Sequence, residues 1–287
     1  MRIKATKGER IFQVCNYIFL TMLALICLYP LWHVIMASFS DSDALLAQEG
    51  LLLWPMEFTV DSYKRVFSNP NVLTGYKATL KLLVLGVSWQ MIMTILGAYV
   101  LSRREFMLRR PIMLAITFTM FFSGGMIPTY MNIEQLGLKG SIWGLIIPFS
   151  INTYNMIILR TSFESLPESL LEAAKIDGAG HLTSLFRIVL PLSKATLSVI
   201  TLYYGVATWN AWFWAAQLMK DRTQMPLAVV LRDILINSQM QQMDTGVTST
   251  EGIKYALIVV ATVPILCVYP FIQKHFAQGV MIGAVKE

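Results

Sequence analysis

Residues 172–191 read EAAKIDGAGHLTSLFRIVLP, and this stretch decides how the whole chain is interpreted. It is an acidic segment rich in small residues, and it lies between two long apolar runs. Ser165 followed by Glu168 has the pattern of a capping box, with Pro167 inside the first turn. Gly178 stands where a helix commonly ends in a left-handed conformation that other residues adopt with strain. The segment therefore predicts a helix over 166–177, about three turns long.

This predicted helix has an amphipathic pattern that suits docking onto a soluble partner. Leu170, Leu171, Ala174 and Asp177 have the spacing of a single helix face, and the adjacent alanines would let the helix enter a groove. An interfacial linker lying on lipid is the alternative, but such linkers usually carry Lys and Arg. Acidic residues outnumber basic ones here, namely Glu164, Glu168, Glu172 and Asp177 against Lys175 and Arg187. We therefore favour docking.

Composition places the chain in the membrane. It has 287 residues, of which 55% are hydrophobic and only 14% charged, whereas soluble domains average about 25% charged residues. The net charge of +6 does not indicate nucleic-acid binding, because the basic residues flank apolar runs. Three scattered cysteines (Cys15, Cys27 and Cys267) show neither pairing nor metal-ligand spacing. The first apolar run is too long for a signal-peptide core and is expected to stay as a span.

A membrane crossing needs about 20 apolar residues. Six stretches qualify, near 12–36, 78–101, 111–131, 142–162, 190–217 and 254–275. The third is interrupted by Gly124-Gly125 and Pro128, and the fourth by Pro148, Asn152 and Asn155. Breaks of this kind are tolerated where neighbouring helices or a water-lined cavity satisfy the freed backbone. Both linings of a translocation path and simple kinks fit them. We expect an all-α integral membrane protein with six transmembrane helices forming a single domain over 1–287.

Lys and Arg set the orientation through the positive-inside rule. They gather at the N-terminus, at 103–110, at 160–194 and after the last span. These segments are therefore cytoplasmic, which places both termini and the loop 163–189 inside the cell. The outer segments are 37–77, with short helical turns, and 218–253. In the latter, 226–235 predicts a short amphipathic helix, followed by a mobile polar run over 239–252.

The loop resembles the coupling loop of ABC-importer permeases, whose pattern is E-A-A-x-x-D-G-A followed after a gap by I-x-L-P. Glu172, Ala173, Ala174, Asp177, Gly178, Ala179 and Pro191 match its fixed positions, together with Ile188 and Leu190. Trp209-Asn210 and the C-terminal run 279–286 resemble the maltose-type carbohydrate permeases. Residues 124–130, GGMIPTY, resemble the oligosaccharide and polysaccharide branch of that family.

The resemblance implies the type I importer fold and a set of partners. These are a second, homologous permease forming a heterodimer, two cytoplasmic ATPases and an extracellular solute-binding protein. ATP and Mg²⁺ would be bound by the ATPases, and alternating access would carry a sugar from the binding protein to the cytoplasm. Glu168, Glu172 and the loop residues that match the pattern would dock the ATPase. In relatives, the loop before the last span contacts the binding protein, and the C-terminal tail contacts the ATPases. Residues 236–252 and 279–287, respectively, occupy these positions in this chain.

The sequence shows no motif typical of nucleotide binding, metal binding or catalysis. No G-x-x-x-x-G-K-[ST] run is present, so we expect no ATP site, no cofactor and no enzyme activity in this chain. His33, His181 and His275 lack the spacing of metal ligands. An ABC permease for a non-sugar solute remains open, as does an ion-coupled secondary transporter, although the span interiors contain no Asp or Glu. A membrane-embedded enzyme is a third alternative.

A sugar presents hydroxyl groups and an apolar ring face, so its path requires amides and aromatic rings. Two groups of residues fit, Trp209, Asn210 and Trp212 in the fifth span and Asn152, Tyr154 and Asn155 in the fourth. An interfacial aromatic belt is the alternative for the tryptophans. Hydrogen bonding between helices is the alternative for the asparagines. Both groups are therefore candidates for the substrate path, with these alternatives open.

Overall fold

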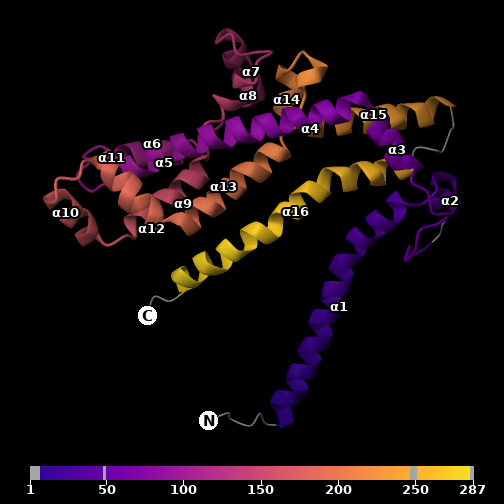
Figure 1. The fold of residues 1–287 in the computed structure, drawn as a ribbon, viewed down its shortest axis with the longest axis horizontal. Helices are drawn as coiled ribbons and strands as arrows, with labels where there is room; N and C mark the ends of the chain where they lie inside the picture. The colour runs from indigo at the N-terminus through magenta and orange to yellow at the C-terminus, as the bar shows by residue number, and fades with distance from the viewer. Residues whose placement is uncertain (1–6, 48–49, 246–250, 285–287) are drawn as a thin grey trace. The chain divides into compact units, whose positions relative to one another are not determined.

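The computed structural model describes residues 7–47, 50–245 and 251–284. These residues form helices and loops, with no strand among them (Figure 1). They group into two compact units, residues 1–70 with 231–263 and residues 71–230 with 264–287.

The first unit contains three helices from the N-terminal region and parts of the two last helices. Its helices are α1 (Lys7–Ser38), α2 (Ser42–Ala47) and α3 (Asp61–Ser68), with the end of α15 (Leu227–Thr245) and the start of α16 (Glu251–Ala284). The predicted helix over 226–235 was too short, because α15 continues to Thr245 and takes in the start of the polar run. Part of the polar run, 246–250, lies outside the described residues. The short helical turns expected over 37–77 are present as α2 and α3.

Polar contacts tie the segment after α2 to the end of α1. The Trp32 Nε1–H group donates to the Leu53 carbonyl at 2.9 Å, and the Leu52 N–H group donates to the Tyr29 hydroxyl at 3.0 Å. The start of α16 approaches so closely that a Cβ on Gly252 would lie 2.5 Å from the Ser62 hydroxyl oxygen. Only glycine fits this contact without displacing its neighbours.

The second unit contains the helices between residues 70 and 230. They are α4 (Pro70–Leu82), η1 (Leu83–Val87), α5 (Ser88–Ser102), α6 (Arg109–Phe118), α7 (Met126–Gln135), α8 (Trp143–Ile146), α9 (Thr153–Glu164), α10 (Glu168–Ile176), α11 (His181–Ser184), η2 (Leu185–Val189), α12 (Leu190–Leu192), α13 (Lys194–Trp209), α14 (Phe213–Leu218) and η3 (Arg222–Gln224). The η1 and η2 segments are π-helical turns, so α4, η1 and α5 form one continuous helix.

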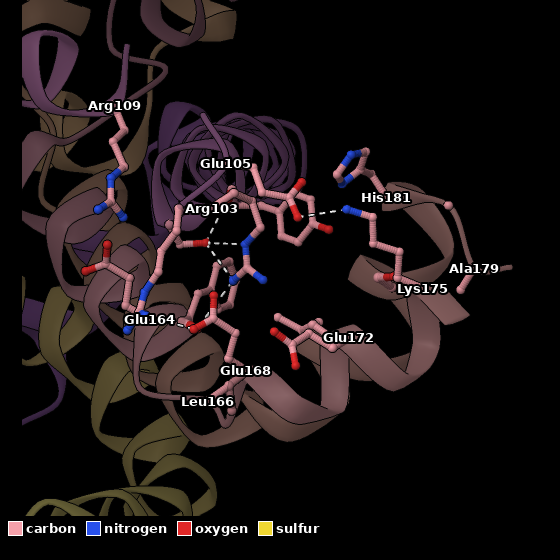
Figure 2. Close-up of a pocket in the computed structure, with 17 residues that line it drawn as sticks. Arg103, Glu105, Arg109, Glu164, Leu166, Glu168, Glu172, Lys175, Ala179 and His181 are labelled. Carbon is pink, nitrogen blue, oxygen red and sulfur yellow. Dashed lines mark hydrogen bonds and ion pairs between the residues drawn. The ribbon is translucent and has the colours of Figure 1, made fainter. Parts of the chain in front are cut away.

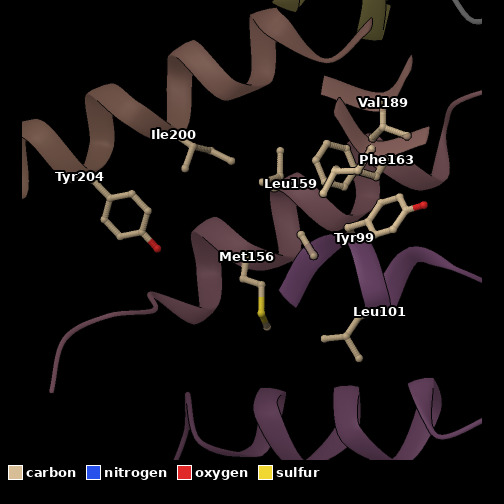
Figure 3. Packing of buried hydrophobic residues seen from close by; sticks show 10 residues of the cluster. Tyr99, Leu101, Met156, Leu159, Phe163, Val189, Ile200 and Tyr204 are labelled. Atoms are coloured by element: carbon tan, nitrogen blue, oxygen red, sulfur yellow. The ribbon is translucent and has the colours of Figure 1, made fainter. Parts of the chain in front are cut away.

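The core of this unit lies where α5, α9 and α13 pack together (Figure 3). Buried apolar side chains fill it, including Leu159 and Ile200, which are fully buried, and Phe163 at 1% exposure. Burying a side chain of this size stabilises a fold by about 1.5–3 kcal/mol. Helix α9 is therefore held firmly, and it leads directly into the loop 163–189.

Long, apolar helices account for some of the six predicted crossings. Among the described residues, Gly8–Ser38 and Pro70–Ser102 are long and apolar enough to cross a membrane. These helices contain the predicted spans 12–36 and 78–101. A third candidate is a bent pair, His181–Leu192 and Lys194–Trp209, whose parts meet at 85°. The predicted stretch 254–275 lies within α16.

The remaining predicted spans are broken helices. The break between α6 and α7 falls at Gly124-Gly125, where Gly125 has φ +88°, as the glycine pair suggested. In 142–162, the helix breaks between Ile146 and Thr153. The stretch 190–217 breaks after Trp209 and resumes at Phe213.

Candidate functional site

Helix α10 forms the middle of the loop 163–189 and ends as the sequence predicts. Its C-cap is Asp177, and Gly178 follows with φ +81°. The Gly178 N–H group donates to the Lys175 carbonyl at 3.1 Å, and the Ala179 N–H group donates to the Ala174 carbonyl at 2.8 Å. These two bonds are those of a Schellman motif, which satisfies carbonyls that a helix end would otherwise leave unpaired.

The predicted start of this helix was wrong. The helix begins at Glu168, with Pro167 as its N-cap, and no side chain caps it. The Ser165 hydroxyl instead donates to the Ser162 carbonyl at 2.8 Å, so it belongs to the end of α9. A short polar side chain between two helices can form a hydrogen bond with the backbone of either one. Here the Ser165 hydroxyl bonds to the backbone of the preceding helix, α9. Helix α10 has nine residues, shorter than the 166–177 expected.

The structure separates the residues that the sequence placed on one face. Leu171 packs against the core cluster and Ala174 is 9% exposed, so these two turn inward. Leu170, Ala173 and Asp177 are exposed, and Ile176 is 86% exposed. We call Leu170, Ala173, Ile176 and Asp177 the outward stripe of α10. The exposed Ser169 lies on the same face, four residues before Ala173, so the face is mixed, with three exposed apolar side chains, and it could be covered by a partner.

A charged groove of about 630 Å³ lies on the other side of α10 (Figure 2). It is bounded by the end of α5, the residues that follow it, the end of α9 and α11. The Arg104 guanidinium pairs with the Glu168 carboxylate at 2.9 Å, and Lys175 Nζ donates to the Glu105 carboxylate at 2.9 Å. Figure 2 shows Glu105 and Lys175 directed toward one another. Glu172 also lines this groove and lies one helical turn before Ile176, so it stands at the border between the groove and the outward stripe.

Sequence reasoning missed the contribution of Arg104 and Glu105. They lie about 60–70 positions before their partners, in a segment used only to assign the cytoplasmic side. One signal was available in the sequence. Arg104 and Glu105 are adjacent and of opposite charge, and the loop 163–189 on the same predicted side of the membrane also carries both acidic and basic residues. Lys175 lowers the pKa of the Glu105 carboxyl, first through its hydrogen bond and then through its positive charge. The carboxylate therefore stays ionised at neutral pH, with Lys175 beside it.

Pro191 lies beyond the loop, in the one-turn helix α12, and is exposed. The chain turns through 85° between α12 and α13. A proline is tolerated here because it lies in the first turn of α12, directly after the π-helical turn η2, where a missing N–H group costs little. The apolar run that looked like a straight span in the sequence therefore begins with a sharp elbow.

The second group of candidate residues lies at the break before α9. Asn152 is the N-cap of α9, and its side chain accepts a hydrogen bond from the Asn155 N–H group at 3.1 Å. Asn152 and Tyr154 are exposed, whereas Asn155 is buried. Asn152 thus has a structural role as a cap, and Tyr154 presents its ring to the surroundings.

Neighbouring helices satisfy the backbone freed by this break. The Trp89 indole donates to the Ser150 hydroxyl at 2.8 Å, and the Gln90 amide donates to the Phe149 carbonyl at 3.0 Å. The Tyr204 hydroxyl of α13 accepts from the Asn152 N–H group at 2.9 Å. The bonds to the Phe149 carbonyl and from the Asn152 N–H group satisfy backbone groups, as unwound backbone inside a membrane requires, whereas the Trp89 bond anchors the Ser150 side chain.

The aromatic candidates surround the break at the end of α13. The Asn210 amide caps α13 by donating to the Val206 carbonyl at 2.9 Å. Trp209 lies 6.4 Å from Tyr76 between ring centroids, and Trp212 lies 5.6 Å from Phe213. Trp214 and Phe149 are 5.4 Å apart, so this break and the break before α9 are neighbours. The two groups of candidate path residues therefore belong to adjoining segments.

Comparisons with known proteins agree over nearly the whole chain. Residues 7–282 match the family model described as "Binding-protein-dependent transport system inner membrane component". The polygalacturonan/rhamnogalacturonan transport system permease protein YtcP of Bacillus subtilis is 44% identical, with 97% of this chain and 99% of that protein covered. Protein LplC of the same organism is 42% identical over 98% and 97% of the two chains.

A solved structure is similar as well. It is a chain of a bacterial ABC transporter involved in the import of the acidic polysaccharide alginate, with a TM-score of 0.85 and 34% identity. The match covers 96% of this chain and 99% of that one. The helical architecture, the coupling-loop sequence and these matches lead to one conclusion: this chain belongs to the family of binding-protein-dependent transport system inner membrane components.

Proposed function

We propose that the chain is the transmembrane permease subunit of an ATP-driven importer of oligosaccharides or polysaccharides. It is a transport subunit and not an enzyme. The observation that carries the proposal is helix α10, a short helix with an exposed apolar stripe and a Schellman stop in a chain that has no ATP-binding motif of its own. Relatives named for polysaccharide, maltodextrin and arabinooligosaccharide transport support the sugar class.

In this proposal, the whole chain acts as one permease domain with six crossings and both termini in the cytoplasm. Two cytoplasmic ATPases bind ATP and Mg²⁺, and α10 of this chain docks onto one of them. Glu168, Glu172, Ala173, Ala174, Asp177, Gly178, Ala179 and Pro191 form or support that contact. Their inward members hold the helix, while the outward stripe touches the ATPase.

A second, homologous permease completes the pathway, and an extracellular binding protein delivers the sugar. The broken helices supply the lining of the path in this chain. Asn152, Tyr154 and Asn155 lie at one break, while Trp209, Asn210 and Trp212 lie at the adjoining one. Exposed rings such as Tyr154 suit the apolar face of a sugar. ATP binding turns the cavity outward, and ATP hydrolysis returns it to the cytoplasm.

Uptake in reconstituted vesicles tests this function. The chain is purified with its permease partner, ATPases and binding protein, and is offered labelled oligosaccharides of galacturonan, rhamnogalacturonan, alginate and maltodextrin. We expect ATP-dependent accumulation of at least one of them, and none when a hydrolysis-deficient ATPase is used. Uptake by this chain alone under a proton or sodium gradient would overturn the proposal. Transport of amino acids but of no sugar would overturn the substrate class.

A further inference from the structure

Two neighbouring residues of opposite charge hold the two ends of α10. Arg104 pairs with Glu168 at the first residue of the helix, and Glu105 pairs with Lys175 one residue before its end. Glu168 and Lys175 are seven residues apart, which is about 10 Å along a helix. The residues 104–105 follow α5, whose side chains form part of the core.

The apolar contacts of α10 are too few to fix its direction alone. Leu171 packs against the core cluster and Ala174 is buried, both near the middle of the helix, and Leu166 packs against the cluster two residues before it begins. A nine-residue helix is also marginal by itself, since isolated helices need about 12–15 residues. These apolar contacts leave the C-terminal end of α10 able to swing, whereas ion pairs at both ends oppose such a movement. The flanking 178–180 segment, Gly-Ala-Gly, offers little stiffness of its own.

We propose that Arg104 and Glu105 are positioning residues that clamp α10 at both ends, so that a push on α10 moves the α5–α9 core instead of being absorbed in the flanking segments. The inference rests on the proposed function, because it assumes that an ATPase pushes α10. The clamp acts on the local opening and orientation of α10 and not on the global stability of the fold. Both pairs are exposed, with side-chain exposures of 73% and 51% in one and 69% and 65% in the other. Such pairs contribute little to folding.

Charge reversal and charge exchange test the clamp in the assembled, reconstituted transporter. The readouts are sugar molecules imported per ATP hydrolysed and hydrogen exchange of the amides of residues 168–178. Glu105→Lys and Lys175→Glu each place like charges together. We expect each to lower the import ratio about fivefold and to speed amide exchange. The double variant E105K/K175E restores the opposite charges and should return both readouts to the starting level.

The chain offers a matched control in Asp61 and Lys64. They pair at 2.8 Å with side-chain exposures of 65% and 72%, within helix α3 of the other compact unit. Asp61→Lys and Lys64→Glu should leave the import ratio within about twofold, as expected for an exposed pair with no positioning role. An Arg104→Glu and Glu168→Arg series repeats the test at the other end of α10.

Each outcome decides the inference. Loss in the single variants and recovery in the exchange support the clamp. Unchanged import ratios in both single variants would overturn it, as would loss that the exchange does not repair. A wild-type complex that imports no sugar with ATP would instead refute the proposed function, so the two failures are distinguishable. Should one reversal prevent assembly, the other reversal and the exchange still decide the result.

Discussion

At the scale of single residues, Gly178 has a backbone conformation that a branched side chain adopts only with strain. Its φ of +81° closes the Schellman motif at the end of α10. No other atoms lie within 4 Å of the position that a Cβ would occupy. The requirement for glycine therefore comes from the backbone alone and not from crowding.

Gly178→Val tests this requirement. The substitution should cost about 1–2 kcal/mol at the helix end and lower sugar import per ATP, with little effect on membrane insertion. Gly180→Ala is the control, because Gly180 has φ −74° and its Cβ position is also open. Import ratios in vesicles compare the two. Unchanged transport by the valine variant would show that the left-handed stop is dispensable.

Tyr204 supports the broken fourth span with one hydroxyl. That group lies 2.7 Å from the Thr94 hydroxyl and accepts from the Asn152 N–H group. Tyr204→Phe should therefore lower the free energy of unfolding by about 1–2 kcal/mol. Thermal unfolding in detergent measures the effect. Tyr203→Phe on the same helix is the control, since Tyr203 is 40% exposed. Equal melting of both variants would contradict the structural role of this hydroxyl.

At the scale of elements, α10 has two sides with different tasks. Its inward side carries Leu171 and Ala174, and its outward stripe is exposed, where the proposed ATPase would dock. Asp177 belongs to the outward stripe and Glu172 lines the groove, so under the proposed docking we expect the charge of Asp177 to matter more.

Asp177→Lys should weaken retention of the ATPase in detergent pull-downs, since it reverses a charge on the docking side. Glu172→Lys should do so to a smaller extent. Glu57→Lys provides a control, because Glu57 is exposed on a segment between α2 and α3. If the Asp177 and Glu57 variants retained equal amounts of ATPase, docking through the outward stripe would be wrong.

Elements differ in how far the sequence could predict them. Gly178 and the break at Gly124-Gly125 were predictable, because glycine marks local backbone conformations. The end of α9 and the start of α10 were not, since Ser165 has two helices within reach and only packing decides between them. The 85° elbow after α12 and the ion pairs of Arg104 and Glu105 depend on contacts between distant segments, which no local pattern encodes.

At the scale of the whole molecule, the positive-inside rule predicts that the loop 163–189 is cytoplasmic and that the segment 218–253 is outside the cell. The structures of the individual helices do not test this orientation. With Cys15, Cys27 and Cys267 replaced by serine, a cysteine at Thr183 should react with a membrane-impermeant maleimide only after cells are opened. A cysteine at Thr223 should react in intact spheroplasts. Both positions are exposed, so burial does not confuse the comparison. The reverse labelling pattern would invert the proposed orientation.

The outward stripe of α10 also has a consequence for how the cell makes this transporter. Ile176 is 86% exposed and nearby Leu182 is 65% exposed, both on the loop that we place in the cytoplasm. A newly inserted subunit would expose these apolar side chains until its ATPase binds. We therefore expect unassembled copies to be removed by proteases, so that the supply of ATPase sets how many copies survive.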